Sequence, residues 1–106
     1  TDDMRDSSSL SMIPYLVKKG AMVNYYDPTG EKNEFKKIKN VKFSKNIKSA
    51  IKESDLIIVH TEWNDFKSIN FSKDVSNKKF VLYDMRNIYS LNKMKEQKIN
   101  YFGVGR

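Results

Sequence analysis

The sequence of 106 residues contains no cysteine and little histidine, tryptophan, proline or glycine. Without cysteine, this chain can form no disulfide, no thiolate metal site and no cysteine nucleophile. Its single histidine, His60, excludes a metal site built from several histidines. The four glycines are Gly20, Gly30, Gly103 and Gly105. They do not form a glycine-rich phosphate loop, because the one close pair runs into the end of the sequence with no helix after it.

Long hydrophobic runs are also missing. No stretch approaches the roughly 20 apolar residues of a membrane-spanning helix, and the first residues lack the basic and apolar segments of a signal peptide. We therefore expect a cytoplasmic protein with no membrane partner. The sequence opens on Thr1 instead of methionine, so we expect a piece of a longer protein, and residues 1–106 fit a single domain.

Positive charge is abundant but is carried almost entirely by lysine. Lys and Arg together number 20, of which only Arg5, Arg86 and Arg106 are arginine, and the formal net charge is +7. The lysines are spread from Lys18 to Lys98, whereas a nucleic-acid-binding surface concentrates basic residues together with aromatics or arginines. We interpret the lysines as a solvated surface and expect no nucleic-acid partner.

Hydrophobic patterning predicts an alternation of helices and strands. Residues 56–59 form a continuous branched aliphatic run, which is typical of a parallel strand covered on both faces. Further strands are expected at residues 21–26, 41–43, 80–83 and 99–102, and helices after Ser9, Asn46 and Ser90. This order predicts a three-layer, Rossmann-like α/β domain with a mostly parallel sheet. Since no apolar strand precedes the first helix, we expect the first strand of the sheet to be missing by truncation.

Polar residues follow the two most apolar of these strands. Thr61, Glu62 and Trp63 come after residues 56–59, and Arg86 comes after residues 80–83. The carboxyl edge of a parallel sheet is where ligands bind in this class of fold. A guanidinium there can bind a phosphate or carboxylate in bidentate fashion. The alternative for Arg86 is a salt bridge, to Asp84 or to Glu62.

The other residues of this cluster each allow two interpretations. For His60 we favour packing at the strand end over general acid-base chemistry. Glu62 and Asp65 could act as a carboxylate pair, but we favour capping of the segment that follows the strand. Trp63 could stack on a base, but we favour a role in closing the end of the core. We expect no metal site and no catalytic residue in this chain.

Five motifs, taken in order, point to one family. They are Thr1-Asp2-Asp3-Met4-Arg5-Asp6-Ser7, Gly20-Ala21 with Tyr26-Asp27-Pro28, Thr61-Glu62-Trp63-Asn64-Asp65-Phe66, Asp84-Met85-Arg86-Asn87 and Gly103-Val104-Gly105-Arg106. Each motif is weak alone, but the ordered set at these distances resembles the carboxyl-terminal domain of the UDP-glucose 6-dehydrogenase family. Two positions depart from the family pattern, Ser8 where Pro is common and Met85 where Gly is usual, and neither change removes a charged contact.

The resemblance implies a longer, three-part enzyme. In this family an amino-terminal domain binds NAD, a helical middle domain builds the dimer and carries the catalytic cysteine, and the carboxyl-terminal domain covers the UDP-sugar. The family oxidises the C6 alcohol of the sugar to a carboxylate in two NAD-dependent steps, through an aldehyde and a cysteine thioester. The implied ligand is a UDP-sugar, and the implied cofactor is NAD, bound mainly by another domain. We expect the chain to be inactive alone and its parent to be a homodimer or larger.

Family roles can be carried to individual residues. Arg86 matches the arginine that reaches the UDP-sugar, and Arg5 matches an arginine that approaches the NAD. Thr61, Glu62 and Trp63 match a family motif, and we expect them to shape the edge between domains. The family's substrate-contacting lysine would lie just before the first residue of this sequence.

Two further functions stay open at this point. A UDP-N-acetylhexosamine or GDP-mannose 6-dehydrogenase would use the same kind of domain, and the pair Arg86-Asn87 favours UDP-glucose only by resemblance. A non-catalytic nucleotide-binding module is the second alternative, although it would need its own phosphate-binding loop.

Overall fold

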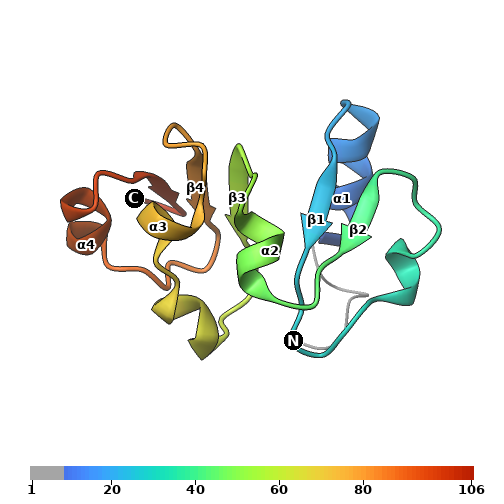
Figure 1. Cartoon of the computed structure of the whole chain (residues 1–106), viewed down its shortest axis with the longest axis horizontal. Helices are drawn as coiled ribbons and strands as arrows, with labels where there is room; N and C mark the ends of the chain where they lie inside the picture. Colours follow the sequence, from blue (N-terminus) through green and yellow to red (C-terminus); the bar gives the residue numbers. More distant parts are fainter. Residues whose placement is uncertain (1–8) are drawn as a thin grey trace. The chain divides into compact units, whose positions relative to one another are not determined.

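A computed structural model describes residues 9–106 of the chain (Figure 1). The chain divides into two compact units, residues 1–50 and residues 51–106, which are described separately below. No helix in the described range is long and apolar enough to cross a membrane.

The first unit contains a two-stranded parallel sheet. Its elements are α1 (Ser9–Lys18), β1 (Val23–Tyr25), the 3-10 helix η1 (Asn33–Phe35), β2 (Val41–Phe43) and most of α2 (Ile47–Ile51), which runs into the second unit. β1 pairs with β2 in parallel, with Tyr25 opposite Phe43. The Tyr25 ring packs against Phe35 and Phe43, each at 5.3 Å between ring centroids. Gly20, just past α1, has a φ of 97°, the left-handed conformation that commonly ends a helix.

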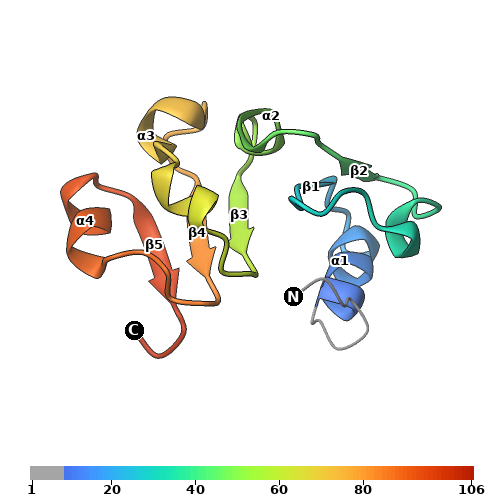
Figure 2. The same ribbon diagram turned by 90° about the horizontal axis from the view of Figure 1, so that it is seen from below.

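The second unit contains a three-stranded parallel sheet. Its elements are β3 (Leu56–Val59), the 3-10 helix η2 (Asn64–Ser68), α3 (Phe71–Asp74), β4 (Val81–Asp84), α4 (Leu91–Glu96) and β5 (Asn100–Gly103). The strand order is β3-β4-β5, so β4 is the middle strand. Figure 2 shows the three strands side by side with their arrowheads at one edge.

A small aromatic and aliphatic core holds this unit together. Three side chains are 0% exposed: Phe71 of α3, Val75 directly after α3, and Leu82 of β4. The Phe71 ring meets the Tyr89 ring edge-on at 5.4 Å, and α3 lies beside β4 in Figures 1 and 2. Asn70 caps α3 by accepting a hydrogen bond from the backbone N–H of Lys73. Burial of these side chains therefore fixes α3 and β4 relative to each other.

The predicted α/β class with parallel strands is confirmed, and the strands fall into two small sheets. The two-sided cover predicted for residues 56–59 is only partly found. Ile57 and Val59 are buried, but Leu56 is 47% exposed. The reason is that the face of the sheet that carries Leu56 is the less covered one, because Tyr83 of the middle strand and Phe102 of β5 on this face are also exposed, whereas Leu82 on the other face is fully buried.

Candidate functional site

The carboxyl ends of the three parallel strands lie together in the second unit. Val59 is in register with Asp84, and Asp84 is in register with Gly103, so the last residues of β3, β4 and β5 are neighbours. The backbone N–H of Met85 continues the ladder by donating to the carbonyl of Val59 at 2.9 Å. We call residues 61–63, 85–87 and 104–106, which follow the three strands, the rim. The edge that carries the rim is the arrowhead edge in Figure 2.

The rim brings together two residues that the sequence places 24 positions apart. Arg86 donates from both Nε and Nη2 to Oε1 of Glu62, at 3.3 Å and 3.0 Å. The Arg86 and Glu62 side chains are 49% and 56% exposed. Of the two salt-bridge partners predicted for Arg86, Glu62 is therefore the one that forms the ion pair. Asp84 instead accepts a hydrogen bond from the backbone N–H of Arg86 at 3.1 Å.

This arrangement leaves Arg86 able to exchange its partner. An ion pair between two exposed side chains contributes about 0.2–1 kcal/mol, since water screens it and two long side chains must be ordered. The Nε–Nη2 edge that Glu62 occupies is a planar pair of donors, which also matches two oxygens of a phosphate. An anion with more charge than one carboxylate can therefore replace Glu62 at little cost. The donor pair of Arg86 thus has the geometry that binding of a phosphate requires.

His60 lies at the start of this segment and is half-buried. Burial lowers the pKa of His60 below its ordinary value, and the nearby positive charge of Arg86 lowers this pKa further. The imidazole is accordingly neutral at neutral pH, and the positive charge beside the end of β3 comes from Arg86. A neutral imidazole is compatible with both interpretations of His60, so the packing role stays a prediction.

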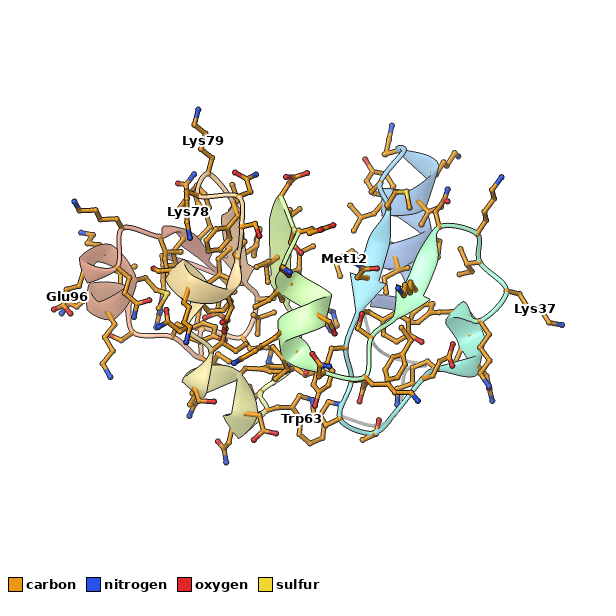
Figure 3. All side chains as sticks on the ribbon, viewed as in Figure 1. Met12, Lys37, Trp63, Lys78, Lys79 and Glu96 are labelled. Atoms are coloured by element: carbon orange, nitrogen blue, oxygen red, sulfur yellow. The ribbon has the colours of Figure 1, made fainter. Side chains whose placement is uncertain are left out.

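The residues after Glu62 turn the chain away from the sheet. Trp63 is half-buried and stands directly before η2, which has no side-chain hydrogen bond at its first capping position. The interpretation of Glu62 as a cap is therefore wrong, because its carboxylate forms an ion pair with Arg86, in the loop after β4. Figure 3 shows Trp63 and Lys79 at opposite ends of this unit. Thr61 is half-buried as well, and the edge-shaping role of Thr61, Glu62 and Trp63 stays a prediction.

Arg5, the predicted NAD-contacting residue, lies outside the described residues, as does the rest of the first motif. Residues 9–106 contain no group of three or more His, Asp or Glu side chains that could hold a metal ion.

Asp84 organises the backbone next to Arg86, a role that reasoning from the sequence missed. Its carboxylate is 0% exposed and accepts three hydrogen bonds. The donors are the backbone N–H groups of Arg86 and Tyr89, both at 3.1 Å, and the hydroxyl of Tyr101 at 2.7 Å. A signal was present in the sequence, because Asp84 ends a run of apolar and aromatic strand residues, and a buried carboxylate there needs several donors. The identity of those donors depends on strand register, which the sequence does not state.

Comparisons with known proteins agree on one family. The family model for the UDP binding domain of the UDP-glucose/GDP-mannose dehydrogenase family matches residues 1–91. Proteins named UDP-glucose 6-dehydrogenase are 36% identical in Rhizobium meliloti and 35% identical in Rickettsia bellii, over 100% and 99% of this chain. A protein of the same name from Bacillus subtilis is 28% identical over 100% of the chain.

These relatives are much longer than the present sequence. The chain covers 24% of the Rhizobium protein, 25% of the Rickettsia bellii protein and 24% of the Bacillus protein. The chain thus spans about a quarter of the curated relatives it matches, and the family model lies on that quarter. The motifs quoted above, the parallel α/β fold and the family match agree: this chain belongs to the UDP-glucose/GDP-mannose dehydrogenase family and contains its UDP binding domain.

Proposed function

We propose that residues 1–106 form the UDP-sugar-binding domain of a UDP-glucose 6-dehydrogenase. The complete enzyme would oxidise UDP-glucose to UDP-glucuronate with two NAD. Support comes from the name shared by the relatives, and from the family model, which extends across both units and so treats them as parts of one domain.

The observation that carries this proposal is the exposure of Arg86 and its weak ion pair. Its guanidinium lies at the rim, half exposed, and its contact with Glu62 is an exposed ion pair. In the bound state the diphosphate of the UDP-sugar would take the place of the Glu62 carboxylate on the Nε–Nη2 edge. The backbone beside the guanidinium is fixed, because Asp84 holds the Arg86 N–H. The guanidinium itself is a planar fork of donors, so it loses less entropy per hydrogen bond to a diphosphate than a lysine would.

The reacting groups would come from other parts of a longer protein. The sequence has no cysteine, so a thioester intermediate would form on another domain. NAD, when bound, would accept the hydride in each oxidation step. The space beside Gly103 is filled by its neighbours, since a Cβ built there would lie 2.5 Å from Asn87 Oδ1. The backbone at Gly103 is therefore not open to the close approach of a dinucleotide. We therefore propose that NAD is bound mainly by another domain, with Arg5 approaching it.

The task of this chain would be to hold the nucleotide end of the substrate. Binding energy from a part of the substrate that does not react can position the part that does. By fixing the diphosphate, Arg86 would hold the sugar C6 at the groups that oxidise it. Assembly of the parent into a homodimer or larger, and its cytoplasmic location, stay predictions.

The proposal is tested by titrating the chain of 106 residues with UDP and measuring the heat of binding. The Arg86→Ala substitution removes the guanidinium that is proposed to bind phosphate. It is expected to weaken UDP binding by at least about tenfold, or about 1.4 kcal/mol. Lys79→Ala is the matched control, since it also removes one exposed positive charge but at the other end of the unit (Figure 3). If the Arg86→Ala variant bound UDP as tightly as the unchanged chain, Arg86 would not be part of the UDP-binding site.

The nucleotide itself distinguishes the second candidate function. The family includes GDP-mannose dehydrogenases as well as UDP-glucose dehydrogenases, so the match leaves the base open. We expect UDP to bind more tightly than GDP in parallel titrations, and the reverse order would favour a GDP-mannose dehydrogenase. If UDP-N-acetylglucosamine competed with UDP better than UDP-glucose does, the UDP-N-acetylhexosamine enzyme would be favoured.

A further inference from the structure

Asp84 is the centre of a hydrogen-bonded network at the end of the middle strand. One carboxylate oxygen, Oδ1, accepts from the Arg86 N–H, and the other, Oδ2, accepts from the Tyr89 N–H and the Tyr101 hydroxyl. A buried carboxylate without such donors would be strongly unfavourable. Asp84 therefore needs all three groups, and in binding them it sets the path of the backbone from Arg86 to Tyr89.

The end of β5 closes this network from the other side. Arg106 Nη1 donates to the carbonyl of Tyr89 at 2.6 Å and to the hydroxyl of Tyr101 at 3.0 Å. Asn87 Nδ2 donates to the carbonyl of Val104 at 2.8 Å. The loop that carries Arg86 is consequently attached to β5 and the segment after it. The three contacts are Asn87–Val104, Tyr101–Asp84 and Arg106–Tyr89, and each joins residues 17 positions apart.

Gly103 lets these two segments approach closely. A Cβ added at Gly103 would lie 2.5 Å from Asn87 Oδ1, 2.9 Å from Arg106 Cδ and 3.0 Å from the Tyr101 hydroxyl. These three contacts involve the side chains that make the attachment. A residue larger than glycine would push them apart.

The chemistry of Tyr101 agrees with a strong bond to Asp84. Burial raises the pKa of Tyr101 to about 12, and the hydrogen bond to Asp84 raises this pKa in the same direction. The hydroxyl is thus held in its neutral, donating form. A neutral donor on a buried carboxylate is a charge-assisted hydrogen bond, which is stronger than a bond between neutral groups.

We propose that Tyr101 and Arg106 are positioning residues, which act through Asp84 to fix Arg86 for the diphosphate of the nucleotide sugar. This inference rests on the proposed function, since it assumes that Arg86 binds the diphosphate. It adds that the affinity of Arg86 depends on two residues that bond to Asp84, Tyr89 and each other. The alternative is that the network only stabilises the fold and has no effect on the affinity of Arg86 for the diphosphate.

A double-mutant cycle separates these two possibilities. Tyr101→Phe removes the hydroxyl and keeps the ring, and it is expected to weaken UDP binding about fivefold to tenfold, or about 1–1.4 kcal/mol. In the Arg86→Ala background the same substitution is expected to have no further effect on UDP affinity, because it acts through Arg86. Tyr83→Phe, at an exposed tyrosine of β4, is the matched control and is expected to leave UDP affinity unchanged.

The results decide the inference and the proposed function separately. If Arg86→Ala weakens UDP binding but Tyr101→Phe does not, the proposed function stands and the positioning role is overturned. The positioning role is also overturned if Tyr101→Phe causes the same loss in both backgrounds. If Arg86→Ala has no effect, the proposed role of Arg86 fails first, and the inference fails with it.

A second variant and a second measurement cover the case that Tyr101→Phe disturbs folding. Arg106→Gln removes the exposed guanidinium at the end of the segment, and we expect it to weaken UDP binding in the same direction. In both variants the Arg86 backbone amide should exchange its hydrogen faster, because its acceptor on Asp84 is less well held. Unchanged exchange at Arg86 together with unchanged affinity would overturn the positioning role.

Discussion

The turn after β1 and the rim after β3 and β4 both place charged residues at the end of a parallel strand, but they use them differently. After β1, Asp27 Oδ1 accepts from the N–H and the hydroxyl of Thr29, at 2.8 Å and 2.6 Å, and Lys32 Nζ donates to the same hydroxyl at 2.6 Å. Gly30, with a φ of 106°, completes this turn. All of its partners come from one short segment.

At the rim the partners come from different strands. Glu62 and Arg86 are 24 residues apart, and Asp84 and Tyr101 are 17 residues apart. The comparison teaches that charge at a strand end is not by itself a sign of a site. In the turn after β1 the polar groups serve the turn, whereas at the rim the buried Asp84 fixes the backbone and Arg86 stays exposed with a replaceable partner.

The largest expected difference between the two regions is in stability. Asp84→Ala leaves one buried and two part-buried donors without an acceptor and should lower the free energy of unfolding by about 3 kcal/mol. Asp27→Ala removes the acceptor of an exposed turn and should cost about 1 kcal/mol or less. Urea unfolding followed by circular dichroism measures both. Equal losses in the two variants would mean that the rim network is no more than another local turn.

A smaller effect, on UDP affinity, is expected when Glu62, the ion-pair partner that Arg86 would have to release, is replaced. Glu62→Gln removes the carboxylate that competes with phosphate, so UDP binding should become about twofold to fivefold tighter, in keeping with the value of an exposed ion pair. Glu96→Gln on α4 is the matched control, since it makes the same change in net charge on an exposed residue of the same unit (Figure 3). Weaker UDP binding by the Glu62→Gln variant would show that Glu62 supports the ligand instead of competing with it.

The smallest expected effect is on the titration of His60. Because Arg86 lowers the pKa of His60, Arg86→Ala should raise this pKa towards its ordinary value, although burial will still hold it down. His60 is the only histidine, so its imidazole signal in a nuclear magnetic resonance titration is unambiguous. Lys79→Ala should leave the pKa unchanged. A His60 pKa that does not respond to Arg86→Ala would place the guanidinium farther from His60 than the structure does.

The same pKa gives a direction for stability against pH. His60 in the folded chain has a pKa below that of the unfolded chain, so folding favours the neutral imidazole. The stabilising contribution of His60 is fully present above the ordinary histidine pKa of about 6.5 and is lost as the pH falls through the lower folded pKa. In the Arg86→Ala variant the loss should begin at the same pH, which the unfolded chain sets, but it should be smaller and complete at a higher pH, because the folded pKa lies closer to the ordinary value.

Much of the fold was predictable because its signals are local. The aliphatic run at residues 56–59 coincides with β3, Val41–Phe43 is β2 as expected, and Ser90 caps α4 through the N–H of Lys93. The turn after β1 was predictable for the same reason, since Asp, Pro and Gly in close sequence specify a turn. The strand ends also placed Arg86 and Glu62 at one edge, and the structure confirms that position.

The network behind Arg86 was not predictable from the sequence. Asp84 was considered only as an ion-pair partner for the Arg86 side chain, whereas it binds the Arg86 backbone and the Tyr101 hydroxyl. These contacts exist because β4 and β5 pair with Asp84 opposite Gly103. A shift of one residue in that register would turn Tyr101 to the other face of the sheet. Strand register is a property of tertiary packing, and no local pattern in this sequence encodes it.

The most direct test of phosphate binding at the rim is to observe the Arg86 side chain while UDP is added. With only three arginines in the chain, the Nε–Hε signals can be assigned and followed in a nitrogen-15 resonance titration. We predict that the Arg86 signal shifts and saturates at the dissociation constant measured by calorimetry, while the signal of Arg106, which is bonded to Tyr89 and Tyr101, shifts much less. A saturating response elsewhere in the chain with the Arg86 signal unmoved would contradict phosphate binding by Arg86.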